Sequence, residues 1–139
     1  MKKNKSIVIG CGRLGSRIAT LLSTKGRNVI MIDKSQDSFR KLGDGFNGYT
    51  IEGDATDIEF LEKQYINDAN TVIITTNDDD VNIFLADVCQ YIFDVPNIYV
   101  RLSDNNKEKI IDSNRIKAIY PFILSINEFG NLFKDNGGE

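Results

Sequence analysis

The sequence predicts an α/β protein with a Rossmann-like, doubly wound parallel sheet of six strands in the order 3-2-1-4-5-6. Short runs rich in Ile, Val and Tyr alternate along the chain with amphipathic segments of helical period. This alternation is typical of a parallel sheet that helices cover on both faces. A glycine-rich turn follows the first apolar run, which is the position that such a turn takes in this fold.

The predicted strands are continuous apolar runs, as expected for strands buried on both faces. The first run is SIVIG, and the glycine-rich turn begins at its last residue. The six predicted strands are residues 6–10, 28–33, 48–52, 70–76, 97–102 and 116–120.

Helical patterns lie between the strands. From Leu14, apolar residues recur at i, i+4, i+7 and i+8, which places them on one face of a helix that Gly26 ends. Ser35 is the expected N-cap of the next helix, and Pro96 closes the long apolar helix of residues 80–93. The helix that begins at Ser35 is predicted over residues 35–42, and the other helices over residues 57–64, 105–113 and 126–133.

The length and composition indicate one soluble domain of 139 residues, with a core over residues 6–121 and a helix or tail over residues 122–139. The formal net charge of −3 does not favour nucleic acid as a partner. No apolar run reaches the ~20 residues of a membrane helix, so direct membrane insertion is not expected. Histidine is absent, which excludes a His-based hydrolase triad in this chain and removes the commonest zinc ligand. We expect a cytoplasmic protein without a metal site.

The three glycines of the turn, Gly10, Gly12 and Gly15, form the pattern G-x-G-x-x-G between the first strand and the first helix. Gly10 permits a tight turn, Gly12 lets a diphosphate approach the main chain, and Gly15 lets the helix pack closely on the strand. The N–H groups and the positive end of the helix dipole then face the phosphates. The alternative is a tight turn that holds no ligand.

Asp33 ends the second predicted strand, 18 residues after Gly15. A carboxylate at this place accepts hydrogen bonds from both hydroxyls of a ribose and repels a 2′-phosphate, so NADP is disfavoured. Lys34 beside it weakens that exclusion. The alternative for Asp33 is a solvated turn residue.

A polar segment, Gly-Asp-Ala-Thr-Asp, follows the third predicted strand. Strand ends on this edge of the sheet line the nucleotide crevice. Asp54 and Ala55 could present a carboxylate and a backbone amide to an adenine edge. Thr56 or Asp57 could instead cap the next helix.

Short polar residues also follow the fourth predicted strand. Thr75, Thr76 and Asn77 could contact a phosphate or a ribose, or could form a turn with Asp80 as the helix cap. The three aspartates of residues 78–80 could bind a hard cation, but the start of a helix explains them more simply.

Five segments together resemble one family: VIGCGRLGSRIATLL, VIMIDK, EGDATDIEFLE, DANTVIITTNDDDVN and IYVRLSD. They are similar to the TrkA-N domains of potassium-transport regulators, also called RCK or KTN domains, from Ile7 to about Tyr120. The resemblance implies a cytoplasmic domain that binds NAD, NADH, ATP, ADP or AMP. It also implies a homodimer or higher oligomer whose geometry controls a membrane potassium channel or transporter subunit at the inner face of the membrane.

The resemblance assigns roles by position. The glycine turn would hold phosphates, Asp33 the ribose of the adenosine, and the segment from Asp54 the adenine. Arg13 would reach phosphates, including those of a neighbouring subunit, and Arg101 would lie at the same crevice. The implied cofactor-binding residues are Gly10, Cys11, Gly12, Arg13, Leu14, Gly15, Asp33, Lys34, Asp54, Ala55, Thr56, Thr75, Thr76, Asn77 and Arg101.

Some of these residues have simpler explanations. Arg13 could face solvent, although a cation in the first turn opposes the helix dipole, and Arg101 could form a surface ion pair. Cys11 is most simply a small residue at a crowded strand end, and Cys89 is expected in the core. The pair Pro121-Phe122 stands where the family usually has proline and glutamate, so the carboxylate of an ion-coupled ATP response is missing.

The predicted helix over residues 80–93 carries apolar side chains on more than one stripe. One face must meet the sheet, and the remainder needs another partner. We expect a dimer interface there, with a contribution from the C-terminal segment. The alternative is a helix wedged between the sheet and that segment of the same chain. The C-terminal residues expected at the interface are Ile123, Leu124, Ile126, Phe129 and Phe133.

A small NAD-dependent oxidoreductase is the alternative function. A dehydrogenase needs a substrate pocket and usually a proton donor or acceptor. All six predicted strands and the glycine turn are used for the nucleotide, and no histidine relays a proton. Binding without chemistry is therefore the expected activity.

Overall fold

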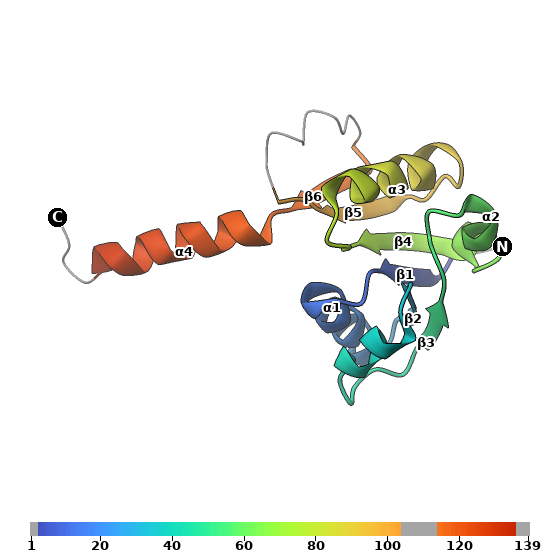
Figure 1. Cartoon of the computed structure of the whole chain (residues 1–139), viewed down its shortest axis with the longest axis horizontal. Coiled ribbons are helices and arrows are strands. Elements are labelled where there is room, and N and C mark those ends of the chain that lie inside the picture. The colour runs from blue at the N-terminus through green and yellow to red at the C-terminus, as the bar shows by residue number, and fades with distance from the viewer. Residues whose placement is uncertain (1–2, 104–113, 136–139) are drawn as a thin grey trace.

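One sheet of six parallel strands forms the centre of the molecule in the computed structural model, which describes residues 3–103 and 114–135 (Figure 1). The strand order is β3-β2-β1-β4-β5-β6, so the predicted fold class and order are confirmed. The strands are β1 (Lys5–Ile9), β2 (Asn28–Asp33), β3 (Tyr49–Glu52), β4 (Ala69–Ile74), β5 (Asn97–Arg101) and β6 (Ile116–Ile119). The α-helices are α1 (Arg13–Thr24), α2 (Ile58–Glu62), α3 (Asp79–Tyr91) and α4 (Pro121–Asp135), and the 3-10 helices are η1 (Gln36–Lys41) and η2 (Ile66–Asp68).

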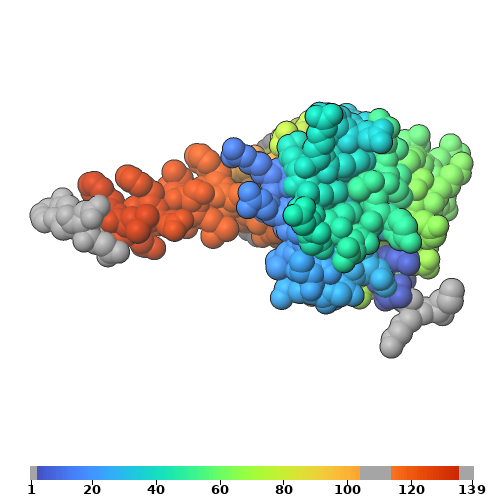
Figure 2. Space-filling model, turned by 90° about the horizontal axis from the view of Figure 1, so that it is seen from below, coloured from blue at the N-terminus to red at the C-terminus, as the bar shows by residue number. Residues whose placement is uncertain are grey.

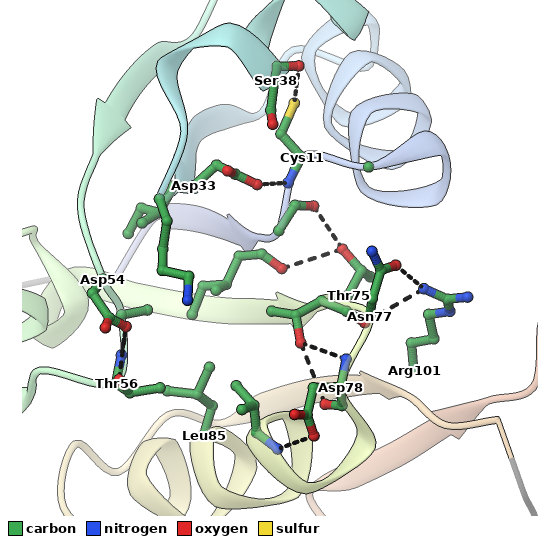
Figure 3. Close-up of a pocket in the computed structure, with 18 of the residues that line it drawn as sticks. Cys11, Asp33, Ser38, Asp54, Thr56, Thr75, Asn77, Asp78, Leu85 and Arg101 are labelled. Carbon is green, nitrogen blue, oxygen red and sulfur yellow. Dashed lines mark hydrogen bonds between the residues drawn. The ribbon is translucent and has the colours of Figure 1, made fainter.

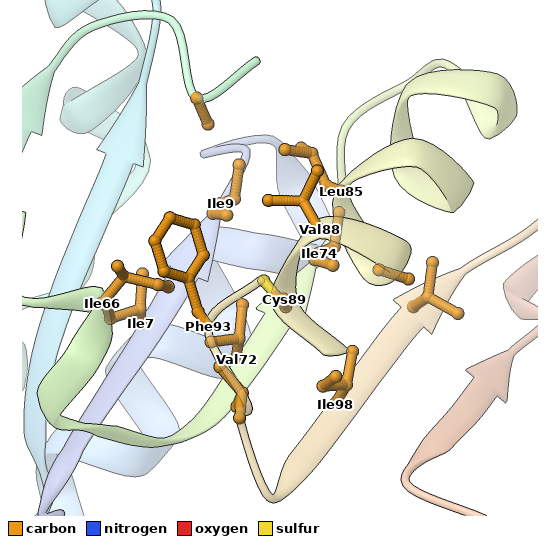
Figure 4. Packing of buried hydrophobic residues seen from close by; sticks show 14 of the residues in the cluster. Ile7, Ile9, Ile66, Val72, Ile74, Leu85, Val88, Cys89, Phe93 and Ile98 are labelled. Carbon is orange, nitrogen blue, oxygen red and sulfur yellow. The ribbon is translucent and has the colours of Figure 1, made fainter. Parts of the chain in front are cut away.

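The core lies on both faces of the sheet because alternate residues of each strand point to opposite sides. In β1, Ile7 and Ile9 belong to the cluster under α2 and α3, whereas Val8 belongs to the cluster under α1 and η1. Figure 4 shows the first cluster, where Val88, Cys89 and neighbouring side chains pack over the central strands. Both faces are therefore apolar, which explains why the strands read as continuous hydrophobic runs.

The helices near the start of the chain largely follow the prediction. Gly26, with φ of +81°, stands just after α1 and ends it as predicted. The segment after β2 is a short 3-10 helix, and Ser35 is its N-cap residue as predicted, although the Ser35 side chain makes no capping hydrogen bond. Ser35 instead donates its N–H to Asp33 Oδ1 at 2.8 Å. The helix predicted over residues 105–113 lies outside the described residues.

The helix α3 buries most of its apolar residues against the sheet. Fewer apolar side chains of this helix are therefore exposed than the sequence led us to expect. Those that remain exposed on α3 or just after it are Phe84, Tyr91 and Ile92. The C-terminal segment does not cover them, because α4 extends away from the sheet (Figure 1). The predicted alternative of a helix wedged under that segment is therefore wrong.

The helix α4 starts at Pro121, five residues before the predicted start. Proline suits the first position of a helix, where its missing N–H has no intrahelical acceptor. Figure 2 shows α4 projecting from the body of the molecule. Ile123 is partly buried. Six other large apolar side chains of α4 are each more than half exposed: Phe122, Leu124, Ile126, Phe129, Leu132 and Phe133.

Within the described residues, no helix combines the length and apolar character that crossing a membrane requires.

Candidate functional site

A pocket of about 740 Å³ opens at the carboxyl ends of β1, β2 and β4 and extends to the ends of β3 and β5 (Figure 3). This is the place where the strand order reverses between β1 and β4, and where open α/β sheets bind their ligands. The predicted residues Leu14 and Gly15 do not line it. The other predicted site residues do: Gly10, Cys11, Gly12, Arg13, Asp33, Lys34, Asp54, Ala55, Thr56, Thr75, Thr76, Asn77 and Arg101.

The three glycines of the turn differ in what surrounds them. Gly10 has a φ of +101°, and a Cβ there would lie 2.8 Å from the backbone N of Thr76. A Cβ on Gly15 would lie 1.9 Å from the carbonyl oxygen of Gly10. A Cβ on Gly12 would meet nothing within 4 Å. The chain's own packing therefore requires Gly10 and Gly15, whereas the space beside Gly12 is open to a ligand.

The N-terminus of α1 carries no side-chain cap and no acidic residue in its first turn. The other two helices around the pocket are capped, α2 by Asp57 and α3 by Asp78. Arg13 is exposed in the first turn of α1, where a cation is unfavourable beside the helix dipole. An anion bound at this N-terminus would accept hydrogen bonds from its N–H groups and offset that cost.

Asp33 is held in place by the backbone around it. Its Oδ2 accepts a hydrogen bond from Cys11 N at 2.7 Å, and its Oδ1 accepts one from Ser35 N at 2.8 Å. A carboxylate can accept about four hydrogen bonds, so each oxygen retains capacity for a ligand hydroxyl. The carboxylate is fixed at the edge of the pocket and remains able to accept.

The two cysteines are buried thiols. Cys11 donates from Sγ to Ser38 O at 3.3 Å, and burial together with the charge of Asp33 raises its pKa to about 11. Burial raises the pKa of Cys89 to about 12, and Cys89 lies in the core as predicted. Both are protonated at neutral pH, which argues against a redox role.

The residues after β3 form a local turn. Asp54 Oδ1 accepts from the Thr56 hydroxyl at 2.7 Å and from Thr56 N at 3.0 Å, and these bonds lower the pKa of Asp54. Asp57, not Thr56, caps α2, because its Oδ1 accepts from Phe60 N. Asp54 therefore presents an ionised carboxylate to the pocket, beside the buried Ala55.

The residues after β4 are divided between the protein interior and the pocket. The buried Thr75 donates its hydroxyl to Gly10 O at 2.9 Å, which fastens the glycine turn to β4. Arg101 donates from Nη1 to Asn77 Oδ1 at 3.1 Å, and both residues line the pocket. Asp78, not Asp80, caps α3.

Within residues 3–103 and 114–135, no three acidic or cysteine side chains cluster closely enough to hold a metal ion.

Several pocket residues were not predicted from the sequence. Lys41 and Ser38 lie in η1, the 3-10 helix that follows Asp33 and folds back over the crevice. No local sequence motif predicts this arrangement. Lys41 adds a fourth cation to Arg13, Lys34 and Arg101. The carboxylates of Asp33, Asp54 and Asp78 also line the pocket. Four positive and three negative side chains therefore line this pocket, although the whole chain has a net charge of −3. The remaining unpredicted lining residues are Ile9, Ile32, Val81 and Leu85, whereas Gly53 and Asp78 belong to the polar segments expected at this crevice.

The fold and the pocket define a Rossmann-type domain whose first crossover offers free backbone donors to an anion. The chain belongs to the TrkA-N domain family, whose model matches residues 6–121. It is 32% identical over 122 residues to the Trk system potassium uptake protein TrkA homolog of Pyrococcus horikoshii, covering 86% of this chain and 53% of that protein. The chain thus spans about half the length of that relative.

Solved structures of the GsuK channel are also similar. The structure described as the GsuK channel bound to NAD has a TM-score of 0.82 and 25% sequence identity, over 99% of this chain and 24% of that chain. The structure of GsuK bound to ADP has a TM-score of 0.78 and 25% identity, over 97% of this chain and 35% of that chain.

Proposed function

We propose that this chain is a nucleotide-sensing regulatory domain that binds NAD(H) or an adenine mononucleotide such as ATP, ADP or AMP. One observation carries the proposal: the uncapped N-terminus of α1, the open space beside Gly12 and the fixed carboxylate of Asp33 all face one pocket. Phosphates accept from the N–H groups of α1, and the ribose hydroxyls donate to Asp33.

The potassium-transport role rests on the relatives. The Pyrococcus horikoshii relative is described as a potassium uptake protein, and GsuK is a channel with structures bound to NAD and to ADP. The partner of this chain is accordingly a potassium channel or transporter subunit in the membrane, and the chain works at its cytoplasmic face. Residues 6–121 form the sensing unit.

A second copy of the chain completes the assembly. Phe122, Ile126, Phe129 and Phe133 of α4 follow each other at spacings of four, three and four residues, the spacing of an apolar seam between helices. Phe129 and Phe133 already stack at 5.9 Å between ring centroids. Pairing with another copy buries this seam, and the bound nucleotide then changes the geometry of the dimer.

Binding, rather than turnover, is the activity. The described lining of the pocket contains no histidine or tyrosine to exchange a proton with a carbonyl substrate. Its floor is formed by Ile9, Ile32 and Leu85, which pack in the core of the same domain. Turnover of NADH with small carbonyl compounds would instead favour the oxidoreductase alternative.

Calorimetry with NAD, NADH, ATP, ADP and AMP tests the proposal. Asp33→Ala removes the ribose acceptor and should weaken binding by about 1–3 kcal/mol. Asp37→Ala is the matched control, because Asp37 is exposed, pairs with Arg40 and lies outside the pocket lining. Circular dichroism of each variant verifies folding. If Asp33→Ala binds as tightly as the unaltered chain, the assignment of Asp33 is wrong.

A further inference from the structure

The side chain of Asn82, in the second turn of α3, is fully buried and makes four hydrogen bonds. Its Oδ1 accepts from Thr76 N at 3.2 Å and from Thr76 Oγ1 at 2.5 Å. Its Nδ2 donates to Thr76 O at 3.1 Å and to Arg101 O at 2.9 Å. Only a side chain with both donors and an acceptor can satisfy these groups, so an amide of this length suits the position.

Asn82 does not line the pocket, but its hydrogen bonds connect two segments that do. Thr76 lies in the loop after β4, and Arg101 ends β5. A second link runs beside the first, where Asp79 accepts from Ser103 N at 3.0 Å and from Ser103 Oγ at 3.1 Å. The loop after β4, the start of α3 and the end of β5 therefore form one hydrogen-bonded unit.

This unit makes one side of the pocket only. In Figure 3, Asp33 and Asp54 lie on the side of β2 and β3, whereas Asn77 and Arg101 lie on the opposite side. The glycine turn lies between them. A mononucleotide such as AMP has one nucleoside and needs only the side with Asp33. A dinucleotide has a second nucleoside, which must extend beyond the phosphates to the side with Asn77 and Arg101.

We propose that Asn82 is a positioning residue that sets the pocket wall for the second nucleoside and so determines the affinity for a dinucleotide relative to that for AMP. The proposal rests on the proposed function of nucleotide binding. Without the amide, the N–H of Thr76 and the carbonyl of Arg101 lose their buried partner, and the carbonyl of Thr76 keeps only the longer bond that Arg101 Nη1 donates at 3.4 Å. The loop must then move to satisfy them, and Asn77 and the Arg101 guanidinium move with it.

Calorimetry with NAD and AMP on Asn82→Ala tests the proposal. The expected result is that affinity for NAD falls by about tenfold or more, while affinity for AMP stays within about twofold. Ser23→Ala is the matched control, since Ser23 is another buried polar residue, accepts from Asn47 N at 2.7 Å and lies away from this pocket. It should leave the ratio of the two affinities unchanged. Equal losses for both nucleotides in Asn82→Ala, or no loss for either, would overturn the role of Asn82.

A measurement on the unaltered chain covers the case in which Asn82→Ala does not fold. In nuclear magnetic resonance spectra, saturating NAD should shift the side-chain amide signals of Asn82, and saturating AMP should leave them in place. Signals that respond equally to both nucleotides, or to neither, would contradict the proposal. If the unaltered chain binds no nucleotide at all, the proposed function itself fails, and the calorimetry reveals this before any variant is compared.

Discussion

At the scale of single residues, the three glycines of the G-x-G-x-x-G motif have different structural roles. Gly15 is confined by the Gly10 carbonyl, 1.9 Å from where a Cβ would stand, whereas nothing lies within 4 Å of the same point at Gly12. A motif read from sequence gives these positions equal weight. The structure separates a glycine required for folding from one whose missing side chain leaves room for a ligand.

The pair Gly12→Ala and Gly15→Ala tests this separation. Gly15→Ala should lower the free energy of unfolding by about 1–3 kcal/mol or more, because the backbone must shift to admit the methyl group. Gly12→Ala should change stability by less than about 1 kcal/mol, yet weaken nucleotide binding by about tenfold or more as the methyl group displaces a phosphate. Urea denaturation and calorimetry on the two variants measure both effects. A Gly12→Ala variant with unchanged affinity would show that no ligand approaches the main chain there.

Much of the site was predictable because parallel strands all end at one edge of the sheet. Residues at or just after the ends of β1, β2 and β4, such as Gly12, Asp33 and Asn77, meet in one pocket even though they are far apart in the sequence. Lys41 was missed because its position depends on how η1 folds back. Asp78 was not recognised as the α3 cap because, in a run of aspartates, the sequence alone does not mark which one begins the helix.

At the scale of elements, α4 is the part whose surroundings the sequence predicted least well. Its apolar pattern predicted a helix correctly. A pattern of this kind does not indicate whether the apolar side chains pack against the same chain or against another chain. The structure leaves the apolar side chains of Phe122, Ile126 and Phe129 exposed to solvent. Exposed apolar surface of this extent is typical of an interface.

The α4 seam gives a prediction about oligomeric state. Phe129→Asp should weaken dimerisation by about tenfold or more, because it places a charge in the apolar seam. Asn127→Asp is the matched control, which adds the same charge one residue beyond Ile126, off the seam. Sedimentation velocity reports the dimer, and thermal unfolding should change little, since Phe129 is more than half exposed within its own chain. A Phe129→Asp variant that remains as dimeric as the control would place the interface elsewhere.

At the scale of the whole molecule, the pocket lies between two halves of the sheet. The β3-β2-β1 half supplies Asp33 and Asp54, and the β4-β5-β6 half supplies Asn77 and Arg101. A ligand that contacts both halves adds interactions between them that exist only in the folded state. The alternation of strands and helices was sufficient to predict this architecture, because short parallel strands with crossovers permit few other arrangements.

Ligand binding should therefore stabilise the whole fold. A nucleotide present at about 100 times its Kd adds about 2.7 kcal/mol, which corresponds to a rise in Tm on the order of 10 °C for a domain of this size. Thermal unfolding with and without each nucleotide measures the rise. Arg27, at the opposite end of the sheet, lies outside this pocket, so Arg27→Ala should show the same rise. A Tm that is unchanged by every nucleotide in excess would contradict binding at this pocket.

In the dimer proposed above, the position of α4 in the chain would connect the pocket to the second copy. The end of β5 is joined to β6 by the bond that Leu102 N donates to Ile119 O at 2.9 Å, and α4 starts two residues later at Pro121. A helix of 15 residues is about 22 Å long. A tilt of about 10° at its root displaces its far end by about 4 Å. In the proposed dimer the helix would therefore act as a lever, because a small shift of the strand end beside the pocket would become a movement of several ångström at the far end of α4, where the second copy would pack.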